Sequence, residues 1–287
     1  MTNLAYTSPL TAERPARSRH YLMTPPRHFA VQYAINPWMH PGVEVDVDLA
    51  LRQWQGLVDT YRGLGHRVDV MEPVPGLPDM VYAANGALVT PKATVAARFA
   101  YPQRADESKA YAAWLDSHGI GPVHVAQEIN EGEGDFLVVG DLILAGTGFR
   151  TSPAAHAEVA LLTGMQVVSL ELVNPSYYHL DTALAVLDDH TIAYYPAAFS
   201  PVAQATLATV FPDAIIATEA DAAVFGLNAV SDGKHVMLAA AASGLAAQLT
   251  SRGFTPVPIE LTELLKGGGS VKCCTLELRR EHVLETL

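Results

Sequence analysis

Short apolar runs occur in pairs along the chain, and a tight polar turn separates the two members of each pair. Residues 136–139 (Phe-Leu-Val-Val) and 142–145 (Leu-Ile-Leu-Ala), for example, flank Gly140 and Asp141. This pattern predicts a β-hairpin. The same pattern occurs at residues 87–97, 184–194 and 228–238, and the turns recur about every 45–50 residues. The chain is therefore expected to consist of tandem modules.

A helical stretch and a further short strand follow each predicted hairpin. The helices are expected over residues 104–117, 153–163, 201–210 and 245–252, and the strands over residues 122–125, 166–170, 214–216 and 255–259. The repeated unit is thus strand–strand–helix–strand. An incomplete first unit spans residues 21–71 with a helix over 46–65, and residues 275–280 are expected to supply its missing strand.

Five such units predict one ring-like α/β domain over residues 20–287, preceded by a loose polar arm over residues 1–19. The segments between units, which precede the hairpins, would gather at one end of this ring. Active-site loops occupy an equivalent place in other modular α/β folds.

Composition narrows the function classes. The chain has 287 residues, 49% of them hydrophobic and 17% charged, as in a soluble globular protein. The net charge of −12 argues against a nucleic-acid partner and favours a cationic small substrate. Apolar runs such as residues 236–242 are too short to cross a membrane, and the N-terminus lacks a signal-peptide pattern.

The two cysteines, Cys273 and Cys274, are adjacent, so they form no disulfide framework and a cytoplasmic location is expected. No CxxC or HExxH motif is present, and no metal or organic cofactor is expected. Whether copies of the chain associate is left open.

The segments before the hairpins carry the unusual chemistry. They are residues 78–86 (PDMVYAANG), 130–135 (NEGEGD), 177–182 (YYHLDT) and the glycine loop 267–273 (GGGSVKC). A ring would bring a cysteine, a histidine and several carboxylates together, which is what thiol catalysis requires. Taken singly, His179 is more typical of a core histidine, the acidic residues of a solvated loop, and the cysteines of inert core positions.

Together these features resemble the pentein superfamily of guanidine-modifying enzymes. The resemblance rests on the five modules, the Glu-Gly-x-Gly-Asp segment at 131–135, the His-Leu-Asp-Thr segment at 179–182 and the glycine loop before Cys273. Residues 22–39 and 78–85 are most similar to the arginine dihydrolase group, and also to dimethylarginine dimethylaminohydrolases. The resemblance implies a five-bladed α/β propeller of ββαβ modules around a pseudo-fivefold axis.

The resemblance also implies roles for individual residues. Cys273 matches the nucleophile, His179 the general acid/base and Glu131 the catalytic acid. The residues expected to bind substrate are Asp135 for the guanidinium, Arg104 and Arg150 for the α-carboxylate, and Asn36, Asp79, Asn85 and Asp181. Asp181 could instead orient His179, or act only as a turn or cap residue.

The chain departs from the family pattern at Asn85. Dimethylargininases and arginine deiminases have an aspartate there, usually preceded by a glutamate where this chain has Ala84. A neutral Asn85 removes one ion pair to a guanidinium and suits a site that also accepts a neutral ureido group. Drift of this residue in an ordinary hydrolase is the alternative.

The expected function is therefore hydrolysis of a guanidino C–N bond through a covalent Cys-thiouronium intermediate. Arginine is the expected substrate, in a dihydrolase reaction that yields ornithine, ammonia and carbon dioxide. Dimethylarginine, giving citrulline and dimethylamine, is the alternative. An amidinotransferase and a non-catalytic arginine-binding module are further alternatives.

Overall fold

The computed structural model describes residues 14–279, and they form five three-stranded sheets. In each sheet the middle strand pairs antiparallel with one neighbour and parallel with the other. The sheets are β15 (Leu276–Glu277), β1 (His20–Met23) and β2 (Arg67–Val70); β3 (Ala87–Val89), β4 (Thr94–Ala96) and β5 (Val123–Val125); β6 (Phe136–Val139), β7 (Leu142–Thr147) and β8 (Gln166–Glu171); β9 (Leu184–Val186), β10 (Ile192–Tyr194) and β11 (Ile215–Ile216); and β12 (Val230–Ser231), β13 (His235–Ala239) and β14 (Thr255–Ile259).

The predicted ββαβ repeat is thereby confirmed. The first module takes its missing strand from β15, which pairs antiparallel with β1 as expected, although it is shorter than the predicted 275–280 and Arg280 lies outside the described residues. One long helix crosses from the middle strand to the last strand of each sheet. These helices are α1 (Val47–Gly63), α2 (Ala105–Ser117), α3 (Pro153–Thr163), α5 (Pro201–Val210) and α7 (Ser243–Ser251).

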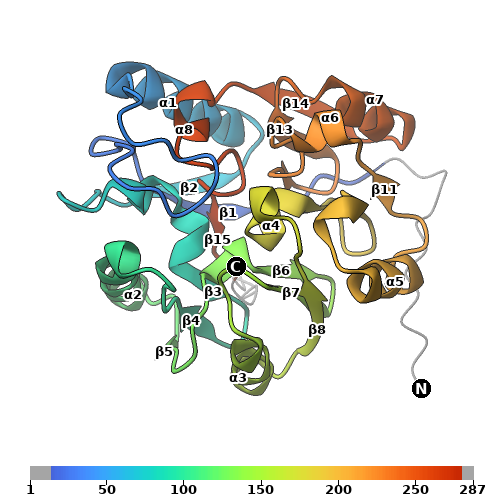
Figure 1. Ribbon diagram of the computed structural model, residues 1–287, viewed down its shortest axis with the longest axis horizontal. Helices are drawn as coiled ribbons and strands as arrows, with labels where there is room; N and C mark the ends of the chain where they lie inside the picture. Colours follow the sequence, from blue (N-terminus) through green and yellow to red (C-terminus); the bar gives the residue numbers. More distant parts are fainter. Residues whose placement is uncertain (1–13, 280–287) are drawn as a thin grey trace, which may run out of the picture.

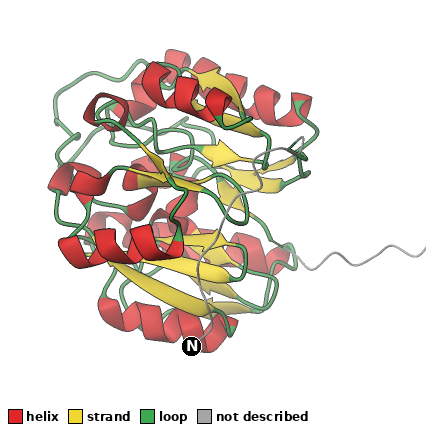
Figure 2. Ribbon diagram, turned by 90° about the vertical axis from the view of Figure 1, so that its right-hand side faces the viewer, coloured by secondary structure: helices red, strands yellow, loops and turns green. Residues whose placement is uncertain are grey.

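The five helices lie around the outside of the molecule and the strands lie inside (Figure 1). Figure 2, turned by 90°, likewise shows strands between helices.

Helix α3 illustrates how the sequence sets the boundaries of a helix. The Ser152 side chain accepts a hydrogen bond from the backbone N–H of Ala155, Pro153 begins the helix, and Gly164 ends it with φ of 64°.

The first strand of each module is largely buried. All three residues of β3 are buried, for example, which explains why these strands read as continuous apolar runs rather than alternating ones. Buried strands leave little freedom for the segments that join them. The site is built on those segments.

Short helical turns precede the first strands. They are the turns η1 (Pro78–Val81), η2 (Ala83–Gly86), η4 (Gly132–Gly134) and η5 (Pro175–Tyr177), and helix α4 (Leu180–Ala183). Helices α6 (Glu219–Ala222) and α8 (Thr262–Leu265) likewise precede β12 and β15, whereas η3 (Pro102–Arg104) and η6 (Pro196–Ala198) follow the middle strands β4 and β10. The sequence pattern predicted none of these as helical, because single turns leave no periodic apolar signal.

The described part of the predicted N-terminal arm, residues 14–19, contacts other parts of the chain. Arg14 forms an ion pair with Asp188 and lies over the ring of Phe254 at 3.6 Å, and Arg17 pairs with Asp189. Arg14 and Arg17 therefore pack on the fourth and fifth modules, whereas Ser18 and Arg19 contact Gly65, His66 and Glu277 of the first module. The remainder of the predicted arm, residues 1–13, lies outside the described residues.

Candidate active site

Cys273 lies after the glycine loop, close to the start of β15. The loop is tightly enclosed: a Cβ atom on Gly267 would lie 2.3 Å from the Tyr82 hydroxyl, and one on Gly269 would lie 2.3 Å from the Tyr82 ring. Gly268 has φ of +83°, a conformation that favours glycine. The three glycines are therefore required by close packing and by backbone conformation, not by a need for a flexible hinge.

Two side chains contact the Cys273 sulfur. Asn228 Nδ2 lies 3.1 Å from Sγ, and Asp181 Oδ2 lies 3.3 Å from it. Burial, followed by the nearby Asp181 carboxylate, raises the pKa of the Cys273 thiol well above its usual value. Both effects favour the protonated form of the unliganded thiol, and a positive charge beside the sulfur would favour the thiolate.

Cys274 is also buried and packs among apolar residues of the first module. Burial raises the pKa of its thiol. No contact joins it to His179 or Glu131 within residues 14–279.

His179 and Glu131 form a buried pair. His179 Nε2 lies 2.7 Å from Glu131 Oε2, and Arg150 donates to the same oxygen at 2.8 Å. Burial opposes ionisation of Glu131, but Arg150 and His179 outweigh it and hold the pKa of this carboxyl well below its usual range. A charged Glu131 fixes the imidazole so that Nδ1 is free for chemistry, and His179 Nδ1 has no partner among the described residues.

Asp135 has a different set of contacts from the one expected. Its Oδ1 accepts a hydrogen bond from the backbone N–H of Leu180 at 3.0 Å, and its Oδ2 accepts one from Thr151 at 3.2 Å. The carboxylate thus joins α4 to the segment that follows β7. Because one of these bonds is to Leu180, the residue after His179, they suit a role for Asp135 in positioning the loop that carries His179.

Arg104 is buried among partners from its own module. Its guanidinium donates to the carboxylate of Glu107, with a shortest distance of 2.7 Å, and to Asn85 Oδ1 at 2.8 Å. Because a guanidinium only donates, this contact places the oxygen of Asn85 toward Arg104 and its NH₂ group away from it. The Asn85 NH₂ group therefore lies beside Gly134 and His179: a Cβ on Gly134 would be 2.3 Å from Asn85 Nδ2 and 3.3 Å from His179 Nδ1.

Arg150 is held between two aromatic rings, with its guanidinium carbon 4.7 Å from the ring centres of Tyr101 and Tyr178. Besides Glu131, it donates to the backbone carbonyl of Ile35 at 2.7 Å. Asn36 caps its own turn by accepting from the backbone of Trp38, and donates to the carbonyl of Gly267 at 3.1 Å. The 29–39 segment is thus fastened across the glycine loop.

Four buried polar atoms of the site have no hydrogen-bond partner among the described residues. They are Asp79 Oδ1, Asn85 Nδ2, His179 Nδ1 and Asp181 Oδ1. Asp79 uses its other oxygen to accept from the Tyr33 hydroxyl at 2.9 Å. Buried polar atoms are normally satisfied, so this group indicates where a polar substrate binds.

Sequence reasoning missed Asn228, which contacts the sulfur, and the tyrosines that enclose the site. The repeat held a signal for Asn228. It lies two residues before the first strand of its module, as Asn85 does before β3. Comparing equivalent places in the five modules would have found it.

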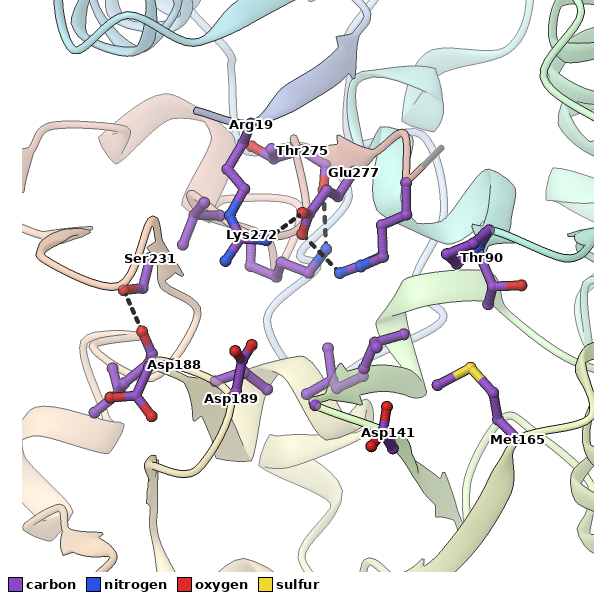
Figure 3. Close-up of a pocket in the computed structure, with 18 of the residues that line it drawn as sticks. Arg19, Thr90, Asp141, Met165, Asp188, Asp189, Ser231, Lys272, Thr275 and Glu277 are labelled. Carbon is purple, nitrogen blue, oxygen red and sulfur yellow. Dashed lines mark hydrogen bonds and ion pairs between the residues drawn. The ribbon is translucent and has the colours of Figure 1, made fainter. Parts of the chain in front are cut away.

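A separate cavity of about 550 Å³ lies at the other end of the modules, among the hairpin turns. Figure 3 shows Arg19, Lys272 and Glu277 on one side of it, with three aspartates, Asp141, Asp188 and Asp189, opposite. Lys272 Nζ binds Glu133 Oε2 at 2.5 Å, and Arg279 binds the other oxygen of Glu133. None of the residues assigned to catalysis lines this cavity, so its size is no guide to the chemistry.

Within residues 14–279, no group of three or more His, Cys, Asp or Glu side chains is arranged to hold a metal ion. No helix in the same part of the chain is long and apolar enough to cross a membrane.

The fold and the buried cysteine–histidine–carboxylate site define a hydrolase of guanidino C–N bonds with the pentein architecture. A model of the family described as N,N dimethylarginine dimethylhydrolase, eukaryotic, matches residues 38–280, and the chain belongs to this family.

Two groups of relatives are similar to the chain. An N(G),N(G)-dimethylarginine dimethylaminohydrolase of Mycobacterium tuberculosis is 61% identical over 93% of this chain and 88% of its own length. The bifunctional arginine dihydrolase/ornithine cyclodeaminase AgrE of Nostoc is 36% identical over 90% of this chain, which spans 37% of that protein. Both groups are therefore relevant to the choice of substrate.

Solved structures agree with this assignment. The substrate-bound N-terminal domain of ArgZ, a cyanobacterial arginine dihydrolase, superposes with a TM-score of 0.88 at 33% identity, covering 92% of this chain and 99% of that one. A dimethylarginine dimethylaminohydrolase structure superposes with a TM-score of 0.74 at 19% identity, covering 91% of this chain and 99% of that one, which supports the fold. The expected five-module pentein architecture is confirmed.

Proposed function

We propose that this chain hydrolyses the guanidino group of dimethylarginine, giving citrulline and dimethylamine. The observation that carries the hydrolase assignment is the buried Cys273 beside four unsatisfied polar atoms of Asp79, Asn85, His179 and Asp181. The choice of dimethylarginine is supported by the 61% identical mycobacterial relative. Arginine was the expected substrate and dimethylarginine the alternative, and the comparisons support the alternative better.

The reaction begins with thiolate formation. Burial and Asp181 keep the Cys273 thiol protonated, so a cationic guanidinium that enters the site lowers the pKa of the thiol by direct Coulomb attraction. Asp181 Oδ1 and Asp79 Oδ1 are free to accept N–H donors of the substrate. The substrate charge therefore activates its own nucleophile.

The thiolate attacks the guanidino carbon and forms a tetrahedral intermediate. In this mechanism the proton lost by the thiol is taken up by His179 Nδ1, and His179 returns it to the leaving amine as the bond to the guanidino carbon breaks, which leaves a thiouronium on Cys273. His179 then takes a proton from water, and the hydroxide adds to the thiouronium carbon and expels the thiolate. Glu131 holds the imidazole throughout and stabilises its charged form.

Arg104 and Arg150 remain the proposed groups for the α-carboxylate, but their present partners limit how they act. Arg150 would exchange its contact with the Ile35 carbonyl for the substrate carboxylate. Arg104 is held by Glu107 and Asn85, so it would have to release one of these contacts to bind the carboxylate, and it also fixes the orientation of Asn85. Asp135 is proposed to position the His179 loop, because backbone N–H groups contact both its oxygens.

The arginine dihydrolase reaction is the second candidate, and the orientation of Asn85 favours it. Arg104 donates to the Asn85 oxygen, so the NH₂ group of Asn85 is directed toward the proposed substrate site as a donor. A guanidinium presents only donors, whereas the ureido group of citrulline presents a carbonyl oxygen that can accept this N–H. Such a site suits a second hydrolysis, of citrulline to ornithine.

One experiment separates the candidates: mass spectrometry of products from dimethylarginine, arginine and citrulline, with Cys273→Ser as the blank. Citrulline and dimethylamine from dimethylarginine, with arginine turned over at least tenfold more slowly, supports the first proposal. Ornithine formed from arginine and from citrulline supports the second and overturns the first.

The same assay addresses the remaining alternatives. Turnover that requires an added acceptor amine would identify an amidinotransferase. A thiol reagent of the haloacetamidine type tests binding: if arginine protects Cys273 and no product forms from any of the three substrates, the chain is a binding module.

A further inference from the structure

Asn228 is held by four hydrogen bonds that fix which end of its amide faces the nucleophile. Its Oδ1 accepts from the backbone N–H groups of Ser270 at 3.2 Å and Cys273 at 3.1 Å. Its Nδ2 donates to the backbone carbonyl of Asp181 at 3.1 Å and lies 3.1 Å from the Cys273 sulfur. Backbone N–H groups only donate and carbonyls only accept, so the amide cannot be reversed without losing three bonds.

The orientation has a consequence for the sulfur. With an N–H of Asn228 directed at Sγ, the proton of the resting thiol points instead to Asp181 Oδ2, 3.3 Å away. When that proton leaves, the sulfur carries a negative charge between a carboxylate that repels it and an amide N–H that attracts it. Hydrogen bonds from a neutral donor to a charged acceptor are about twice as strong as neutral ones.

Asn228 is also completely buried, with 0% of its surface exposed. Its N–H therefore acts on the sulfur without competition from water, and its geometry is set before substrate arrives. The backbone carbonyl of Asn228 additionally accepts from the backbone N–H of Lys272, so three groups of the residue, Oδ1, Nδ2 and this carbonyl, contact the glycine loop.

We propose that Asn228 is a catalytic residue: its side-chain N–H stabilises the Cys273 thiolate and partly offsets the repulsion by Asp181, while its oxygen aligns the loop that carries the nucleophile. The proposal rests on Cys273 being the nucleophile of the proposed hydrolase, and it applies to any substrate that the site accepts.

The test is the pH dependence of thiol alkylation without substrate. Iodoacetamide modification of the Cys273 peptide is followed by mass spectrometry from pH 6 to 11 in the wild-type protein and in Asn228→Asp and Asn228→Ala. The aspartate keeps the shape of the side chain but turns a negative oxygen toward the sulfur. We expect the midpoint pH of Cys273 alkylation to rise by at least about one unit in Asn228→Asp. At a pH below both midpoints, alkylation of this variant should then be at least about tenfold slower than in the wild-type protein. In Asn228→Ala, which loses the N–H donor but gains no negative charge, the midpoint pH should rise by less.

If Asn228 only held the loop in place, its substitution would lower the midpoint pH of Cys273 alkylation instead of raising it. Loosening of the loop would expose Cys273 and move its midpoint down, toward the ordinary cysteine value of about 8.5. Asn174→Asp is the matched control, because it makes the same change at a residue whose side chain caps the backbone N–H of Ser176 and does not contact the sulfur. A midpoint in folded Asn228→Asp that is unchanged or lower would overturn the proposal.

A measurement on the wild-type chain covers the case in which the variants do not fold. The side-chain amide protons of Asn228, followed by NMR, should shift with the same midpoint as the thiol. Signals that do not respond to thiol ionisation would contradict the contact. If the amide responds but none of the three substrates is turned over, the proposed function fails and, with it, the catalytic role of Asn228, while the stabilisation of the thiolate by its N–H stands.

Discussion

Lys272 Nζ lies 2.5 Å from Glu133 Oε2, so the residue before Cys273, the proposed nucleophile, is bound to the middle of the acidic segment. Glu133 is buried, and its other oxygen binds Arg279 of the same C-terminal strand segment. The loop that carries Cys273 and the loop that carries Glu131 are thus joined by an ion pair whose members, Lys272 and Glu133, lie one and two residues from these proposed catalytic groups. The cluster also lines the cavity of Figure 3 through Lys272 and Arg279, on the side away from the chemistry.

Glu133→Gln should therefore destabilise the fold strongly. The change leaves Lys272 without a carboxylate partner and removes one from Arg279, and breaking a buried pair costs about 3–5 kcal/mol. Urea unfolding measures the loss. Glu72→Gln, at an exposed pair with Arg27, is the control and should change stability by less than about 1 kcal/mol. Equal effects of the two substitutions would contradict a structural role for the cluster.

The two cysteines should respond differently to substitution. Cys273→Ser should abolish turnover, because serine lacks a comparably acidic and nucleophilic group. Cys274→Ser should retain at least about a tenth of the activity, since that side chain packs in the core and makes no contact with the catalytic groups. Steady-state assays with circular dichroism as a folding control decide this, and an active Cys273→Ser variant would remove the nucleophile assignment.

His179→Ala should block both halves of the reaction. Without a proton donor for the leaving amine, we expect covalent adduct formation to slow by about 100-fold or more. Intact-protein mass spectrometry under single-turnover conditions measures the adduct. Glu131→Gln, which keeps a hydrogen bond to Nε2 but loses the charge, should slow the same step less. Adduct formation at the full rate in His179→Ala would rule out its acid role.

The sequence was sufficient to predict the repeat, because hairpin turns and helix caps such as Ser152 are local signals. It also placed Cys273, His179 and Glu131 in segments that meet, since each segment precedes a first strand or, for the cysteine, enters β15. It could not predict that Asp135 would be engaged by backbone N–H groups, or that Arg104 would turn the amide of Asn85. Those contacts depend on tertiary packing between modules, which a linear pattern does not record.

Asn85→Asp tests the choice between the two proposed substrates. An aspartate in this place turns an acceptor toward the substrate and adds an ion pair to a guanidinium. We expect kcat/KM for dimethylarginine or arginine to be kept or raised, and any turnover of citrulline to fall at least about tenfold. Initial rates with each substrate provide the comparison. Citrulline turnover that survives the substitution would show that the Asn85 N–H does not bind the ureido oxygen.

Asp181→Asn should stabilise the protein while impairing its chemistry, and the stabilisation should depend on pH. Burial raises the pKa of Asp181 to about 6, from an ordinary value of 3.8. A raised carboxyl pKa favours folding of the protonated form, so this stability is present below pH 4 and is lost as the pH rises from about 4 to 6.

The difference of about 2.2 pKa units corresponds to about 3 kcal/mol at pH 7. Asparagine resembles the protonated acid at every pH. The variant should therefore match the wild-type protein at pH 4 and exceed its free energy of unfolding by up to that amount at pH 7, as measured by urea unfolding across this range. Turnover should fall at the same time, because Asp181 no longer offers a charged oxygen to the guanidinium. A stability difference that does not change between pH 4 and 7 would show that Asp181 is ionised in the folded protein throughout, and that the Cys273 thiol lies beside a permanent negative charge.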